Sequence, residues 1–166
     1  MPKAELKGFE DIYKILNNLS DNAEKILKNG LYEGAGIMAE ELKAKLNSMP
    51  VVGDKENLGA YKRKGKYKLS FTQRKGLIES LGISPFGTTQ KMEIETHIGF
   101  DGYNNIKTKK YPNGQPNQLI ARIVESGSTY MDKTPFIRPA LNSGKKRAEE
   151  KMKQTIEDEI IKLTKE

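Results

Sequence analysis

Three ionisable side chains alternate along one predicted strand and could hold a metal ion. Glu93, Glu95 and His97 are spaced by two residues, so on a strand they share one face. Two carboxylates and an imidazole can bind a divalent cation that serves a hydrolase. The alternative is the polar solvent face of a half-buried strand. We favour the solvent face, because no aspartate-bearing partner motif lies nearby.

The composition excludes several other kinds of catalytic site. The 166 residues include no cysteine and one histidine. A thiol nucleophile, a disulfide scaffold and a cysteine zinc site are therefore excluded, and a Ser-His-Asp triad would have to use His97. We expect no cofactor and no bound metal. No apolar run is long enough to cross a bilayer, and the charged N-terminus has no signal-peptide core, so we expect a protein kept in a cytosol until lysis.

A second group of residues could contact a polyanion or an acidic subunit. Between positions 62 and 75 there are seven basic residues and no acidic one, with Tyr67 and Phe71 among them. The basic residues are Lys62, Arg63, Lys64, Lys66, Lys68, Arg74 and Lys75. Lysines can meet phosphates while aromatic rings stack on bases. A solvated loop, or a loop against an acidic neighbouring subunit, is the alternative.

The overall charge permits such a partner without requiring one. The net charge is +7, carried by 24 lysines and only 5 arginines. Base-specific readout favours arginine. A lysine-dominated surface is more simply a solubility coat with weak, salt-sensitive affinity for polyanions.

The pattern of apolar residues predicts an α+β fold in a single domain over 1–166. A two-part N-terminal helix is interrupted near Asp21 and ends at Pro50, and Gly30, Gly34 and Gly36 within it indicate a kink or the close approach of another backbone. A long basic exposed loop or hairpin follows over 53–75.

The second half of the chain predicts a small antiparallel sheet and two more helices. Residues 76–83 and 92–100 read as strands, joined by a turn at 84–87. A short helix over 117–126 is ended by Gly127. A connector over 134–139 is stiffened by Pro135 and Pro139, and a long C-terminal helix packs on the sheet. We expect Phe136 to anchor the connector in the core and Arg138 to form a buried ion pair with Glu125.

The region around this connector resembles a family of phage proteins. Residues 121–128 read ARIVESGS and residues 134–141 read TPFIRPAL, with a methionine-containing linker between them. These elements resemble the tailed-phage minor tail or tail-completion family, the head–tail joining proteins of the lambda Z type. The order of the earlier elements matches too, with Gly76-Leu77 and Ile98-Gly99-Phe100 at the corresponding places.

The resemblance implies a non-enzymatic structural protein of a bacteriophage or prophage virion, acting in tail completion or head–tail joining. It implies other tail and neck proteins as partners, a ring-shaped homo-oligomer when assembled and transient contact with DNA. It implies no membrane and no small-molecule substrate. The protein would lie at the tail or the head–tail junction after synthesis in the host bacterial cytoplasm. The alternative reading is a small basic nucleic-acid-binding protein.

Overall fold

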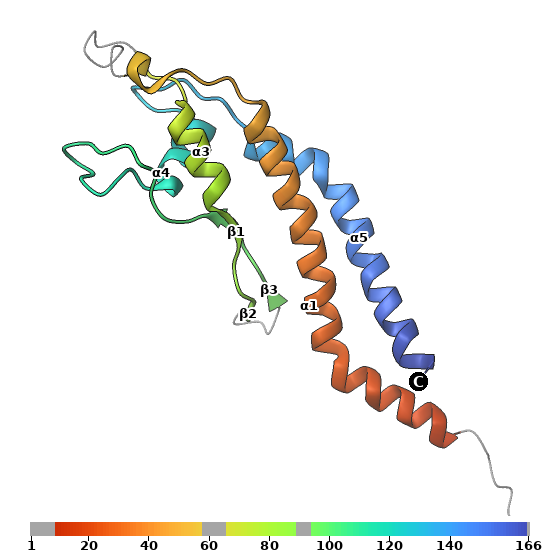
Figure 1. Ribbon diagram of the computed structural model, residues 1–166. Helices are drawn as coiled ribbons and strands as arrows, with labels where there is room; N and C mark the ends of the chain where they lie inside the picture. The colour runs from red at the N-terminus through yellow and green to blue at the C-terminus, as the bar shows by residue number, and fades with distance from the viewer. Residues whose placement is uncertain (1–8, 58–65, 89–93, 166) are drawn as a thin grey trace, which may run out of the picture.

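The chain is an α+β protein in which a long two-helix stem carries a small head. The computed structural model describes residues 9–57, 66–88 and 94–165. The elements in chain order are α1 (Phe9–Ser48), α3 (Phe71–Ser80), β1 (Leu81–Ile83), β2 (Gly87–Thr88), β3 (Ile94–Glu95), β4 (Ile98–Phe100), α4 (Asn117–Ser126) and α5 (Ile137–Lys165). Helices α1 and α5 lie side by side in opposite directions, so α5 packs against α1 and not on the sheet as predicted. Helices α3 and α4 gather at one end of the pair, and β2 and β3 extend from there toward the middle of α1 (Figure 1).

Small residues bring the two stem helices together. A Cβ atom added to Gly30 would lie 2.7 Å from Cγ1 of Ile156, and one added to Gly34 would overlap the side chain of Met152. On α5, Gly144 is equally close to α1, with its added Cβ 2.9 Å from Sδ of Met38. The predicted close approach of another backbone is therefore confirmed at Gly30 and Gly34.

Polar side chains along the edge of the contact fix the register of the stem. Glu41 accepts a hydrogen bond from the hydroxyl of Ser143 at 2.9 Å and pairs with Arg147 at 2.5 Å. These residues are more than one hundred positions apart in the sequence. A slide of α5 by one turn would remove both contacts, so they specify one alignment of the two helices.

The predicted interruption of the first helix near Asp21 is not a break. Residues Phe9–Ser48 form one continuous α-helix, although Figure 1 shows it bending near its N-terminal end, where it is drawn in red. The Ser-Asp-Asn sequence that favours a cap is also tolerated inside a helix when neighbouring turns supply the packing. Within the described residues, no helix combines the length and apolarity that crossing a bilayer requires.

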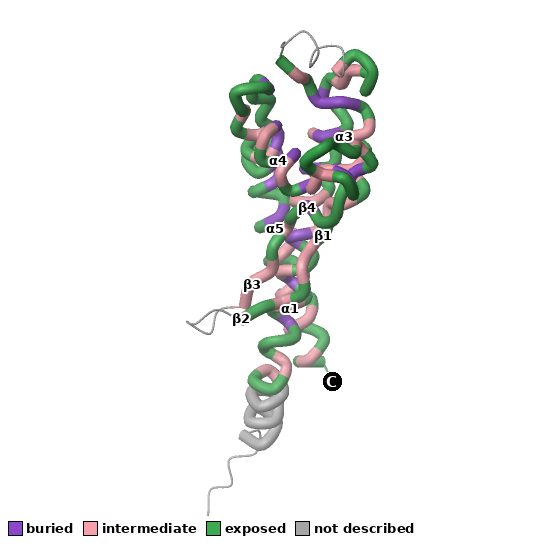
Figure 2. The backbone as a smooth tube through the Cα atoms, turned by 90° about the vertical axis from the view of Figure 1, so that its left-hand side faces the viewer, coloured by how far each residue is buried: buried purple, intermediate pink, exposed green. Residues whose placement is uncertain are grey.

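The hydrophobic core lies where the head meets the upper part of the stem. Its largest fully buried apolar side chains are Leu46, Leu77, Val124 and Phe136. The ring of Phe136 packs edge-on against Phe100, with centroids 5.9 Å apart. Figure 2 shows the buried residues concentrated in the head, while the far part of the stem is mainly half-buried or exposed.

The predicted sheet is two short antiparallel ladders rather than one. Strand β1 pairs with β4, with Leu81 opposite Phe100, and β2 pairs with β3, with Gly87 opposite Glu95. The predicted strand over 92–100 is divided because residues 96 and 97 bond to Ser84 outside both ladders. Residues 92 and 93 lie outside the described part of the chain.

A helix replaces the end of the predicted loop and the start of the predicted first strand. Helix α3 begins after Ser70, whose hydroxyl accepts the N–H of Gln73 while the Gln73 side chain accepts the N–H of Ser70. This reciprocal capping box satisfies two backbone donors that a helix start leaves free. A helical turn also occupies 54–57. The prediction of an irregular segment over 53–75 is wrong in these two places, and residues 58–65 lie outside the described part.

Candidate functional site

The residues that carry the family resemblance meet in one corner between α4 and α5. The Glu125 carboxylate, near the end of α4, accepts three backbone N–H groups at the start of α5. Its oxygens lie 2.7 Å from the nitrogen of Phe136, 2.8 Å from that of Ile137 and 3.2 Å from that of Arg138. A helix start has unpaired N–H groups and a partial positive charge. A carboxylate from another helix therefore caps α5.

The electrostatics of the corner keep this carboxylate ionised. Partial burial raises the pKa of Glu125, but the hydrogen bonds from Ile137, Phe136 and Arg138, with a smaller attraction from the Arg138 charge, together hold the pKa below its ordinary value. The anion is the form that accepts these hydrogen bonds. The cap is consequently complete at neutral pH.

The remaining motif residues shape the chain between the two helices. Gly127 ends α4 with φ +80°, and an added Cβ would lie 3.1 Å from the nitrogen of Lys133. Both facts require glycine there, which confirms the prediction that it ends the helix. Phe136 is 1% exposed, as expected of an anchor. Pro135 and Pro139 are exposed, and Pro139 occupies the first turn of α5, where a missing N–H removes no helical hydrogen bond.

The predicted ion pair between Glu125 and Arg138 is wrong. The Glu125 carboxylate bonds to the backbone N–H of Arg138, and the Arg138 residue is exposed to solvent. Helix α5 begins at Ile137. The backbone N–H groups of residues 136–138 at this helix start therefore point toward the carboxylate and occupy its oxygens, whereas the Arg138 side chain points into solvent. The sequence signal that could have found this arrangement is an acidic residue preceding a proline-marked helix start.

The basic segment contributes one residue to the fold itself. The guanidinium of Arg74 donates to the backbone oxygens of Asn47 at 3.2 Å and Met49 at 3.0 Å. These carbonyls lie at the C-terminal end of α1, where oxygens lack helical partners and the helix dipole favours a cation. Arg74 also lies over the ring of Phe71 at 5.9 Å. It joins α3 to the end of α1.

The other described basic residues are held or paired on the surface. Lys66 pairs with Asp132, and Lys75 pairs with Glu79 at 3.7 Å. The backbone N–H of Lys68 donates to the Asn57 side chain at 3.0 Å. Residues 66–68 thus run beside the linker at 128–133 rather than projecting freely. The other three predicted contact residues, Lys62, Arg63 and Lys64, lie outside the described residues.

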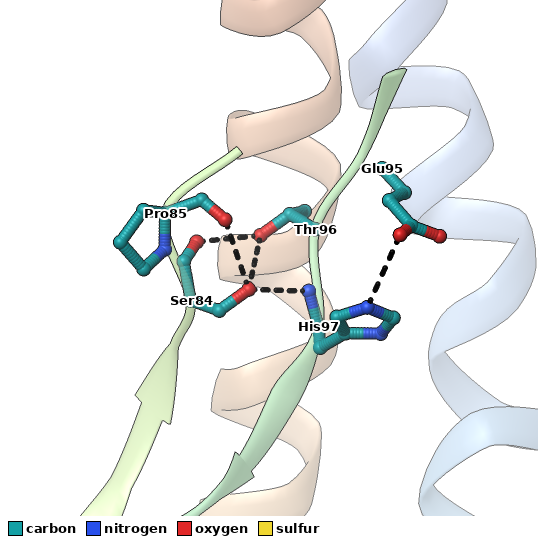
Figure 3. A network of polar contacts seen from close by, with 5 residues as sticks. All are labelled: Ser84, Pro85, Glu95, Thr96 and His97. Atoms are coloured by element: carbon teal, nitrogen blue, oxygen red, sulfur yellow. Dashed lines mark hydrogen bonds and ion pairs between the residues drawn. The ribbon is translucent and has the colours of Figure 1, made fainter. Parts of the chain in front are cut away.

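The candidate metal site lies on the exposed surface, and its polar groups make hydrogen bonds and an ion contact with neighbouring residues. Glu95 and His97 approach to 3.7 Å, and the His97 side chain is 73% exposed. Beside them, the Ser84 hydroxyl accepts the N–H of His97 at 2.9 Å, and the Thr96 hydroxyl donates to the Ser84 backbone oxygen at 2.7 Å (Figure 3). Glu93 lies outside the described residues, within which no group of three potential metal ligands occurs.

A groove on the stem was not predicted from the sequence. It lies between α1, α5 and the turn at 84–87, and it encloses about 360 Å³. Tyr32 of α1 is 55% exposed and packs edge-on against Phe86 of the turn at 6.5 Å. The far wall is α5, including Thr155 and Asp158. The residues of the groove come from three distant segments, so no local sequence pattern could have brought them together.

Comparison of the chain with protein-family models, with curated proteins and with solved structures finds no match in any of the three.

Proposed function

We propose that this chain is a non-enzymatic structural protein of a tailed bacteriophage or prophage virion, acting in tail completion or head–tail joining. Its partners are further copies of itself and other tail or neck proteins, and its place is the tail or the head–tail junction. No membrane, cofactor or small-molecule substrate is part of this function. The proposal rests on the amount of surface that the fold leaves uncovered, together with the family resemblance of the α4–α5 corner.

The uncovered surface is the observation that carries the proposal. The chain exposes 12401 Å², whereas a compact monomer of its 18.7 kDa exposes about 8,300 Å². An allowance of about 160 Å² for each of the 22 residues outside the described ranges accounts for about 3,500 Å² of this difference and leaves an excess of about 600 Å². A protein with this much spare surface is suited to being covered by neighbours, as a subunit of an assembly is.

The corner adds support of a different kind. The residues that resemble the tail-completion family, Glu125, Gly127, Phe136 and Pro139, perform one joint task, which is to set the direction in which α5 leaves the head. A motif with that task maintains the fold of the protein and does not itself catalyse a reaction. This agrees with a family of structural proteins, whose members act by binding neighbouring subunits.

The test is deletion of the gene in the phage or prophage that encodes it. We expect filled heads and separate tails in electron micrographs, and a particle titre reduced by at least a hundredfold, with both defects repaired by the wild-type gene in trans. Purified wild-type particles should contain the chain by mass spectrometry. Intact infectious particles from the deletion strain would overturn the proposal.

The alternative, a small nucleic-acid-binding protein, has its own measurement. Binding of a labelled single strand would have to weaken steeply with salt, with a slope that falls as Lys66, Lys68 and Lys75 are changed to alanine. Under the assembly proposal the same three changes leave binding of the free strand almost unchanged. The two functions are therefore separated without knowledge of the partner proteins.

A further inference from the structure

A second basic segment, on the head, carries lysines that no acidic residue accompanies. Lys107, Lys109 and Lys110 lie within four positions of one another, and residues 102–124 contain no aspartate or glutamate. Residues 107–110 are all exposed. Among the residues that the structure describes, none of these three ammonium groups forms an ion pair. Within that part of the chain, the three positive charges therefore face solvent without a neutralising partner.

These lysines lie at the tip of a closed loop, residues 104–115, which we call the lysine loop. At its base the N–H of Asn104 donates to the backbone oxygen of Gln115 at 2.9 Å. At its tip Thr108 and Tyr111 exchange two backbone hydrogen bonds, each of 3.0 Å. Gly114 has a φ of +114°, and an added Cβ would overlap the backbone oxygen of Asn104, so glycine is required where the loop closes. Backbone contacts thus fix the shape of the loop before any partner binds.

The lysine loop projects from the head on the side away from the two stem helices (Figure 1). The Lys110 ammonium lies 5.5 Å from the centroid of the Tyr111 ring, a contact that orients the charge without neutralising it. Asp101, the acidic residue that precedes the loop, accepts the N–H of Gly102 at 2.7 Å. Its carboxylate is therefore held at the base of the loop, while the lysines occupy the tip.

The chemistry of this tip fits a polyanion and not a protein surface. Protein interfaces have an apolar core in which lysine is depleted, whereas residues 107–110 read Lys-Thr-Lys-Lys and offer no large apolar side chain. Lysine ammonium groups bind phosphates as point charges, and base-specific readout favours arginine. Residues 104–115 contain no arginine. The loop is therefore suited to a phosphate backbone and not to a particular base sequence.

We propose that the lysine loop contacts the phosphate backbone of duplex DNA through Lys107, Lys109 and Lys110. The choice of duplex DNA rests on the proposed function, because DNA passes through a head–tail junction, whereas the polyanion contact rests on the loop itself. The contact is independent of base sequence and weak, with a Kd of about 10⁻⁴–10⁻⁶ M at physiological salt, as is typical of non-specific binding. Contacts of this strength allow a duplex to slide past the protein.

Fluorescence anisotropy of a labelled duplex of about 20 base pairs, titrated with the full chain at several salt concentrations, tests this contact. A chain carrying Lys107→Ala, Lys109→Ala and Lys110→Ala should bind about tenfold more weakly or worse at about 50 mM salt. Each phosphate contact contributes about 0.9 to the slope of log Kobs against log salt concentration, so the slope should flatten by about 2–3. Two duplexes of unrelated sequence should bind equally well. The matched control changes Lys66, Lys68 and Lys75 to alanine, which alters the net charge by the same amount and should leave the affinity and slope almost unchanged.

Equal losses in the two triple variants would show that binding follows net charge alone and would overturn the proposal, as would a wild-type chain that does not bind the duplex at about 50 mM salt. Tighter binding of poly-L-glutamate than of DNA, lost in the loop variant, would overturn it in favour of an acidic protein partner. Circular dichroism should show both variants folded, because all six changed residues are exposed.

The failure of this contact is distinguishable from the failure of the proposed function. A slope that flattens only in the loop variant, together with intact particles from the deletion strain, would refute only the proposed function. A slope that is unchanged in the loop variant, with heads and tails separated in that strain, would refute only this contact.

Discussion

Removing the Glu125 carboxylate should destabilise the protein by weakening the start of α5. In Glu125→Ala, the N–H groups of Phe136, Ile137 and Arg138 lose their common acceptor. In Glu125→Gln the amide oxygen can still accept from part of this set, but without charge. We therefore expect the order of stability to be wild type, then glutamine, then alanine.

The magnitude follows from the kind of interaction that is lost. Loss of a helix N-terminal cap costs about 0.5–2 kcal/mol, and hydrogen bonds to a charged group contribute about 1.5–3 kcal/mol each. Glu125 is only half-buried, so water replaces part of what is lost and the three bonds do not add. We expect about 2–3 kcal/mol for alanine, or a fall in Tm of about 4–12 °C for a chain of this size.

Urea denaturation at several pH values is the appropriate assay. The folded pKa of Glu125 is lowered, so its stabilising contribution is complete above the unfolded pKa of about 4.3 and is lost as the pH falls through the folded value. The gap between wild type and Glu125→Gln should therefore narrow below about pH 4. Arg138→Ala is the control and should change stability by less than about 0.5 kcal/mol. If Arg138→Ala lowers the free energy of unfolding as much as Glu125→Ala does, the capping argument is refuted and an ion pair between Glu125 and Arg138 becomes the better explanation.

Three further predictions concern the stem, the joint between α1 and α3, and the strand residues. Gly34→Ala should destabilise the fold by about 1–3 kcal/mol through overlap with Met152, whereas Gly36→Ala, which has open space, should stabilise the helix by about 0.5–1 kcal/mol; equal effects in thermal melts would contradict this packing. Arg74→Ala should cost about 1–2 kcal/mol in urea denaturation, with Arg74→Lys recovering only part, because a single ammonium does not reproduce both hydrogen bonds. Adding Mg²⁺, Mn²⁺ or Zn²⁺ should leave the Tm unchanged, and a rise that disappears in His97→Ala would show that a metal site exists.

The sequence correctly predicts those features of the fold that depend on the type of a single residue and not on which partner that residue meets. Gly127 and Phe136 have the roles that we predicted from their residue types. A positive φ at the end of a helix is usually adopted by glycine, and a large apolar ring is usually buried in the core. The α+β class is also correct, as is the order in which a small antiparallel sheet, a short helix and a long C-terminal helix follow the first helix, although α3 was not predicted. The close approach at Gly30 and Gly34 followed from the cost of glycine inside a helix.

The sequence does not predict features for which several partners compete for the same polar group, because the distances between those partners depend on the three-dimensional fold. Charge alone pairs Glu125 with Arg138, but the backbone of α5 is nearer. Helix α3 has little helical periodicity, since its buried side chains are only Gln73 and Leu77, and its one strong signal is the capping box at Ser70. The stem groove depends on three segments far apart in the chain, and no local pattern specifies such a meeting.

The antiparallel stem also sets the order of events during synthesis. Helix α1 is made first, yet its partner α5 begins about 90 residues later, which at about 5–20 residues per second is a delay of about 5–18 s. During that time the glycine-lined surface of α1 has nothing to pack against. The stem groove is lined by residues of both α1 and α5, so it does not exist on a nascent chain that lacks α5. The stem therefore forms only after α5 has been made and has docked against α1.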